Sequence, residues 1–103
     1  MDNGASNYRR FLDGDENGIV EIIKEYKDGL LLYLNGFVRN LYIAEEIVEE
    51  TFVKLVVKKP NFSKKSAFKT WLYAIGRNIA IDYLRHNSKM SEDSIEDYQN
   101  MQR

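Results

Sequence analysis

A row of basic side chains with one aromatic residue among them recurs every four residues near the end of the chain. Its members are Lys65, Lys69, Tyr73, Arg77, Ile81, Arg85 and Lys89. Residues four apart are neighbours on an α-helix, and each step drifts by about 40° around the axis. The row therefore forms a basic surface with an aromatic residue in it, which faces away from the core. A solvated lysine-rich face would give the same pattern.

The segment just before this row places an aromatic residue among amide and basic side chains. Residues 59–66 contain one proline, which ends the preceding helix, and then the run Asn61, Phe62, Ser63, Lys64 and Lys65. An aromatic ring among cations is a composition that holds an unstacked base. Phe62 could equally be a hydrophobic plug under the loop, which is the commoner fate of a lone loop aromatic. The loop is therefore a candidate base-binding element with a structural alternative.

Four carboxylates lie on two adjacent turns of another predicted helix. They are Glu45, Glu46, Glu49 and Glu50, and only Lys54 is close enough to offset them. Repulsion between like charges at this spacing costs a few tenths of a kcal/mol per pair. A partner that supplies cations would explain the cluster. The alternative is a merely solvated face, because Glu is a good helix former.

The residues that most enzymes need are scarce. The chain has no cysteine and a single histidine, His86, which has no second histidine to complete a metal site. A di-metal carboxylate site would draw ligands from several helices that face the bundle interior, whereas these glutamates share the polar face of one helix. No glycine-rich phosphate loop and no Ser-His-Asp set is present. We therefore expect no enzymatic activity and no cofactor.

The elements that must position these residues are helices, because apolar residues recur at three- and four-residue steps. The spacing predicts a short helix that ends at Gly14, a long one over residues 19–41, a third over 44–58 and a fourth over 68–87. Trp71, Leu72, Ile75 and Ile79 form the core stripe of the fourth. We expect an all-α fold, a compact bundle of three main helices plus a short N-terminal helix.

Two glycines interrupt the longest predicted helix. Each costs about 1 kcal/mol relative to Ala unless a neighbouring helix must approach closely. We predict close helix packing at Gly36 and, as the alternative, a bend at Gly29.

Charge is segregated along the chain, although the net charge is only −1. Residues 1–57 carry a net −5, residues 58–90 a net +7 and residues 91–103 a net −3. Such segregation can direct two different partners to two different surfaces. We expect a disordered start over residues 1–9, a helical domain over 10–90 and an acidic linker or tail over 91–103.

The composition also bears on location. The absence of cysteine fits a reducing compartment, and the N-terminus lacks the apolar segment of a signal peptide. No run approaches the ~20 apolar residues that a membrane span needs. We therefore expect a soluble cytoplasmic protein without a membrane span.

Three motifs resemble region 2 of the bacterial extracytoplasmic-function RNA polymerase sigma factors. That family has Gly-Asp before an apolar-aromatic helix, then Ala-Glu-Asp-x-Val-Gln-Glu-x-Phe, then Phe-x-Thr-Trp-Leu-x-x-Ile-Ala-Arg-Asn-x-x-Ile-Asp-x-x-Arg. The chain matches them with Gly14-Asp15, residues 44–52 and residues 68–85. The last motif is the specific one. Glu46, Glu49 and Gly76 depart from the family pattern, which has Asp, Gln and Ala there.

The resemblance implies a partner for each charged surface. Glu45, Glu46, Glu49 and Glu50 would contact the clamp helices of the β′ subunit of RNA polymerase core. The loop residues Asn61, Phe62, Ser63, Lys64 and Lys65 would capture an extruded base of the promoter −10 element, on the non-template single strand. The path of that strand would follow Lys69, Tyr73, Arg77 and Arg85. The implied function is to bind polymerase and to recognise and melt the −10 element in transcription initiation.

Two further expectations follow from the resemblance. A sigma-like interaction regulator, which binds polymerase or an anti-sigma factor without reading DNA, is the alternative function. Complete factors of this family also carry a helix-turn-helix domain for the −35 element, which nothing after Met90 could supply. We expect the chain to be the first domain of a longer protein rather than a shortened relative.

Overall fold

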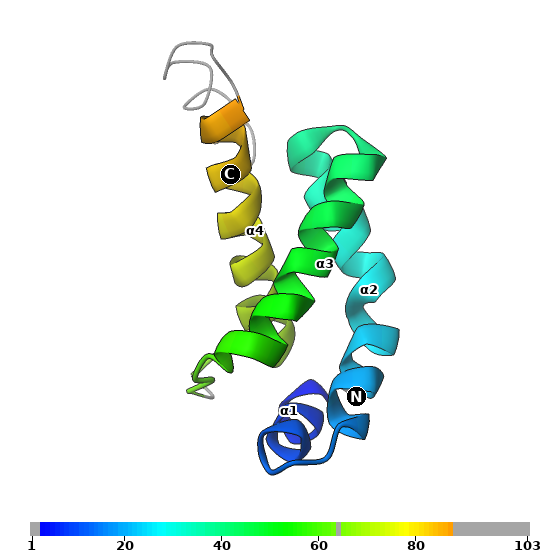
Figure 1. The fold of residues 1–103 in the computed structure, drawn as a ribbon, viewed down its shortest axis with the longest axis vertical. Helices are drawn as coiled ribbons and strands as arrows, with labels where there is room; N and C mark the ends of the chain where they lie inside the picture. Colours follow the sequence, from blue (N-terminus) through cyan, green and yellow to red (C-terminus); the bar gives the residue numbers. More distant parts are fainter. Residues whose placement is uncertain (1–2, 64, 88–103) are drawn as a thin grey trace.

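The computed structural model describes residues 3–63 and 65–87. They form four helices, α1 (Gly4–Leu12), α2 (Asn17–Val38), α3 (Leu41–Lys58) and α4 (Phe68–Asn87), and no strand. Figure 1 shows α2 and α3 side by side, α4 packed along them and α1 across the end of the bundle. The predicted all-α bundle of three main helices and a short first one is confirmed. No described helix is both long and apolar enough to cross a membrane.

The turn between α2 and α3 is short because two adjacent residues end one helix and begin the next. Arg39 adopts the left-handed conformation, with φ 53°, and its N–H bonds to the carbonyl oxygen of Asn35. Asn40 is extended, and its side-chain oxygen accepts the backbone N–H groups of Tyr42 and Ile43 at 3.0 and 3.2 Å. This capping sets α3 antiparallel to α2 (Figure 1).

The core lies where α2, α3 and α4 meet. Leu30, Leu34, Leu55 and Leu72 are all fully buried there. Trp71, Ile75 and Ile79 are half-buried and pack against this cluster, as their helical spacing predicts. The inner face of α4 is therefore a core stripe, which leaves its other face for solvent or a partner.

The helices approach one another closely at Gly76 on α4. A Cβ built there would lie 3.2–3.3 Å from side-chain atoms of Leu30, Leu34 and Thr51. Contacts that close are tighter than ordinary van der Waals packing. The missing methyl, which departs from the Ala of the family pattern, therefore lies at a crowded helix crossing.

The N-terminal segment differs from the prediction. We expected disorder over residues 1–9, but α1 begins at Gly4, so the prediction is wrong for residues 4–9. The reason is tertiary: Tyr8 is only 1% exposed, and Gly4 packs against the ring of Phe68. The predicted tail over residues 91–103 and the last three residues of the predicted domain lie outside the described residues.

The prediction for the two glycines of α2 is wrong in position. Gly36 is exposed, and nothing lies within 4 Å of a Cβ built there. A Cβ built at Gly29 would instead lie 2.5 Å from the hydroxyl oxygen of Tyr73 on α4. The close approach between helices therefore occurs at Gly29, and α2 continues through both glycines as one helix.

Replacing Gly36 with alanine should raise the free energy of unfolding by about 0.5–1 kcal/mol. Alanine restricts the unfolded chain and favours a helix, and the folded structure has room for its methyl group. Gly29→Ala is the matched control, which should destabilise the protein because its methyl would meet Tyr73. Urea unfolding of the two variants checks this. A destabilised Gly36→Ala variant would contradict the packing described for α2.

Candidate nucleic-acid and protein interfaces

The basic row follows the outward face of α4, except for Lys65, which lies in the loop before that helix. Lys65, Lys69, Arg77 and Arg85 are exposed, whereas Tyr73 and Ile81 are half-buried. The ammonium nitrogen of Lys69 lies 5.3 Å from the centroid of the Tyr73 ring. Of the predicted residues, Lys64 and Lys89 lie outside the described part of the chain. The exposed cations could neutralise the phosphates of a nucleic-acid strand that follows the helix.

Tyr73 also packs inward, on α2. Its ring centroid is 4.9 Å from that of Tyr33, and its hydroxyl faces Gly29. Burial is the main cause that raises the pKa of Tyr73, and the neighbouring Tyr33 raises it further. Tyr73 is therefore a member of the basic row whose ring also joins α4 to α2.

The loop between α3 and α4 is held on the aromatic end of the core. Phe62 lies edge-on to Phe68, with centroids 5.5 Å apart, and its centroid is 5.2 Å from that of Trp71. The Tyr8 hydroxyl donates a hydrogen bond to the Pro60 carbonyl oxygen, and burial raises the pKa of Tyr8. Phe62 thus has the packing of the hydrophobic plug that we gave as the alternative. Asn61 and Ser63 are exposed beside it.

A hollow of about 290 Å³ lies between part of α1 and this loop. Its lining is drawn from both sides: Ala5, Tyr8, Arg9, Leu12 and Asp13 from α1 and its C-terminal flank, and Asn61 and Phe62 from the loop. The residues of α1 were missed in the sequence. Arg9 and Asp13 are four apart, which predicts one shared face, but only the tertiary fold brings that face to the loop.

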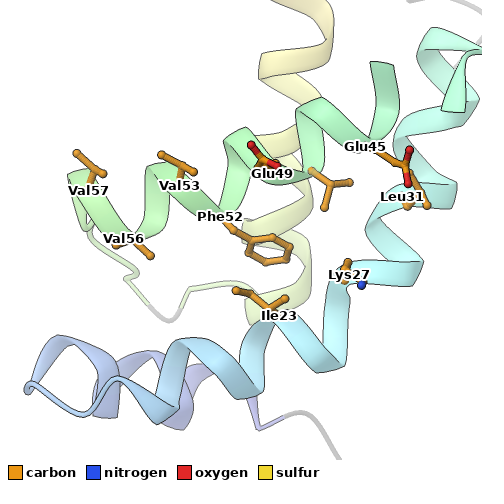
Figure 2. Close-up of a pocket in the computed structure, with 10 residues that line it drawn as sticks. Ile23, Lys27, Leu31, Glu45, Glu49, Phe52, Val53, Val56 and Val57 are labelled. Carbon is orange, nitrogen blue, oxygen red and sulfur yellow. The ribbon is translucent and has the colours of Figure 1, made fainter. Parts of the chain in front are cut away.

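The four glutamates of α3 form two pairs, and the two pairs point to different sides of the helix. Glu45 and Glu49 line a groove shared with α2, as Figure 2 shows. Glu46 and Glu50 line a hollow shared with α4, beside Tyr83 and His86. All four are exposed, and within residues 3–63 and 65–87 none forms an ion pair. The cluster is therefore available to a cationic partner.

The groove between α2 and α3 is mostly apolar and has a volume of about 610 Å³. Ile23 and Phe52 face each other across it, and Lys27 lies near Leu31 on the α2 side (Figure 2). Val53, Val56 and Val57 line its other end, and each is more than two-fifths exposed. The exposure of this end was not predicted from the sequence.

The imidazole of His86 contacts Asp82, one turn earlier on α4. Its Nδ1 lies 2.9 Å from the Asp82 carbonyl oxygen and 3.7 Å from the Asp82 carboxylate. Among the described residues, no group of three or more His, Cys, Asp or Glu side chains is arranged to hold a metal ion.

Known proteins share this sequence pattern. The sigma-70 region 2 family matches residues 22–90. The ECF RNA polymerase sigma factor SigW of Bacillus subtilis is 33% identical over 72 residues, which cover 70% of this chain and 38% of that protein. A probable RNA polymerase sigma factor of Haemophilus influenzae is 34% identical over 76 residues, which cover 73% and 39%.

A third relative, SigM of Bacillus subtilis, is 30% identical over 80 residues, which cover 75% of this chain and 48% of that ECF sigma factor. The chain thus spans less than half the length of these curated relatives. No solved structure gave a significant match. Because the family match covers α3, α4 and most of α2, the resemblance that the motifs predict is confirmed: the chain belongs to the sigma-70 region 2 family.

Proposed function

We propose that this chain is a sigma factor domain that binds RNA polymerase core and recognises and melts the promoter −10 element in transcription initiation. The observation that carries the proposal is the division of exposed charge between two helices. Lys69, Arg77 and Arg85 lie on α4, whereas the exposed glutamate cluster lies on α3. Membership of the sigma-70 region 2 family supports a polymerase partner and a DNA partner.

The basic face of α4 and the preceding loop would bind the non-template single strand. Lys65, Lys69, Arg77 and Arg85 would follow its phosphates, with Tyr73 beside them. Asn61, Ser63 and Lys64 would meet an extruded base, for which Phe62 would offer the exposed part of its ring. Trapping that base would offset the few kcal/mol that its extrusion costs.

The glutamate cluster of α3 would bind the β′ clamp helices through Glu45, Glu46, Glu49 and Glu50. Charge complementarity of this kind raises the association rate and fixes the orientation of the partner. The domain would work in the cytoplasm and contribute binding, not catalysis, because RNA synthesis belongs to the polymerase.

The double variant Lys69→Ala and Arg77→Ala should bind a −10-like single strand roughly tenfold more weakly at low salt. It should also flatten the dependence of log affinity on log salt by about 0.7 for each phosphate that the variant no longer neutralises. Fluorescence anisotropy across a salt series measures both quantities. The pair Lys24→Ala and Lys27→Ala removes the same charge from exposed positions on α2 and should leave them nearly unchanged. Unchanged affinity and slope in the α4 variant would overturn the DNA assignment.

The alternative function, a sigma-like regulator that holds polymerase or an anti-sigma factor without reading DNA, is not favoured by the comparisons, because the family match and the relatives are sigma factors. Such a protein would bind the β′ clamp region and show no preference among single-stranded oligonucleotides.

A further inference from the structure

The helix α1 has no role in the function proposed above, yet it forms one wall of a hollow beside the candidate DNA-binding loop. The family match begins at residue 22, so α1 lies outside it. Arg9 and Asp13 line the hollow from one side, and Asn61 and Phe62 line it from the other. Two elements distant in sequence thus place polar side chains around the same space.

The two walls are held in place by specific contacts. Tyr8 donates its hydroxyl hydrogen to the Pro60 carbonyl oxygen, which joins α1 to the loop next to Asn61. The ammonium nitrogen of Lys59 lies 5.6 Å from the centroid of the Phe11 ring, which adds a second link. The hollow is therefore a feature of the packed fold.

The two arginines of α1, Arg9 and Arg10, differ in the contacts that their side chains make. Arg10 donates to the Asp15 carboxylate at 3.0 and 3.1 Å and to the Asn7 side-chain oxygen at 2.9 Å. Arg9 and Asp13 are exposed and form no ion pair among the described residues, although they lie one turn apart. Arg10 thus supports the fold, whereas Arg9 and Asp13 are available to a ligand.

The size and chemistry of the hollow fit one unstacked nucleobase. Its volume, about 290 Å³, is near the lower limit of the ~300–1,000 Å³ typical of small-molecule sites. The half-buried ring of Phe62 gives it an aromatic wall, on which a base can pack. The Arg9 guanidinium donates hydrogen bonds, the Asp13 carboxylate accepts them and the Asn61 amide does both.

We propose that α1 forms the second wall of the base-binding pocket, in which Arg9 and Asp13 select a base that carries an exocyclic amino group. Asp13 accepts a hydrogen bond from that amino group, and Arg9 donates to the neighbouring ring nitrogen or carbonyl oxygen of the same base. The proposal rests on the proposed function, because it takes the loop to bind single-stranded DNA.

The test uses the full chain and fluorescein-labelled single strands with a −10-like sequence. At each position in turn, deoxycytidine is replaced by deoxyuridine, and deoxyadenosine or deoxyguanosine by deoxyinosine, which removes the exocyclic amino group. We expect one position at which this removal weakens binding to the wild-type protein about tenfold. Asp13→Asn and Arg9→Ala should each reduce that discrimination to about twofold or less, with unchanged thermal stability.

Two further variants make the outcome specific. Asn61→Ala should alter discrimination at the same position as Asp13→Asn, because both side chains would face one base. Lys24→Ala removes a charge from α2 and should preserve the discrimination. If Asp13→Asn and Arg9→Ala both keep the full tenfold effect, α1 is not part of the pocket. If the wild-type protein binds no strand or discriminates at no position, the proposed function fails, and this inference fails with it.

Discussion

Reversing the charges of Glu46 and Glu49 together should weaken binding to RNA polymerase core by about 100-fold or more. Truncating one partner of a charge pair that is buried and hydrogen-bonded in the interface costs about 2–5 kcal/mol, and reversal adds repulsion. Glu46 lies on the side of α3 that faces α4, and Glu49 lies on the side that faces α2. A partner that covers the exposed face of α3 would therefore contact both new lysines.

Binding of the Glu46→Lys and Glu49→Lys double variant to an immobilised β′ clamp fragment measures the effect. The matched control is Glu21→Lys with Glu25→Lys, which makes the same change in charge at exposed positions of α2. Because all four positions are exposed, both variants should keep their helical content and thermal stability. Undiminished binding by the α3 variant would place the polymerase contact elsewhere.

Replacing Phe68 with alanine should lower the free energy of unfolding by about 3–5 kcal/mol. The ring is 1% exposed, and its centroid lies 5.4–5.8 Å from those of Tyr8, Tyr26, Phe62 and Trp71. Phe68 therefore joins α1, α2, the loop and α4 in one cluster. A loss of this size is a large fraction of the ~5–15 kcal/mol that stabilises a typical domain.

Leu32→Ala is the control for this prediction, because Leu32 is apolar but 72% exposed on α2. It should change the free energy of unfolding by no more than about 0.5 kcal/mol. Chemical denaturation followed by far-ultraviolet circular dichroism compares the two variants. Equal, small losses in both would mean that the aromatic cluster does not hold the domain together.

The helices of this domain were predictable because local patterns determine them. Apolar spacing located the four helices. The start of α1 was missed because Gly4 is small and Asn7 is polar, which does not suggest burial. Both are nevertheless buried in the fold, against residues of α2 and α4. Tertiary contacts decide such positions, and spacing along the chain does not record them.

The candidate site was predictable in part for the same reason. The exposure of Lys69, Arg77 and the glutamates follows from helical periodicity. The inward turn of Phe62 depends on Phe68 and Trp71, which a loop sequence alone cannot reveal. Likewise, the tight contact at Gly29 exists because Tyr73 crosses from another helix.

Recognition of the −10 single strand is the central claim, and a panel of −10-like strands with each base varied in turn tests it most directly. The domain should bind the non-template strand with base preferences at one or a few positions, each worth about tenfold in affinity. It should bind the complementary strand more weakly. Equal affinity for every strand in the panel, with salt dependence alone, would contradict the account, because phosphate contacts by themselves carry no sequence information.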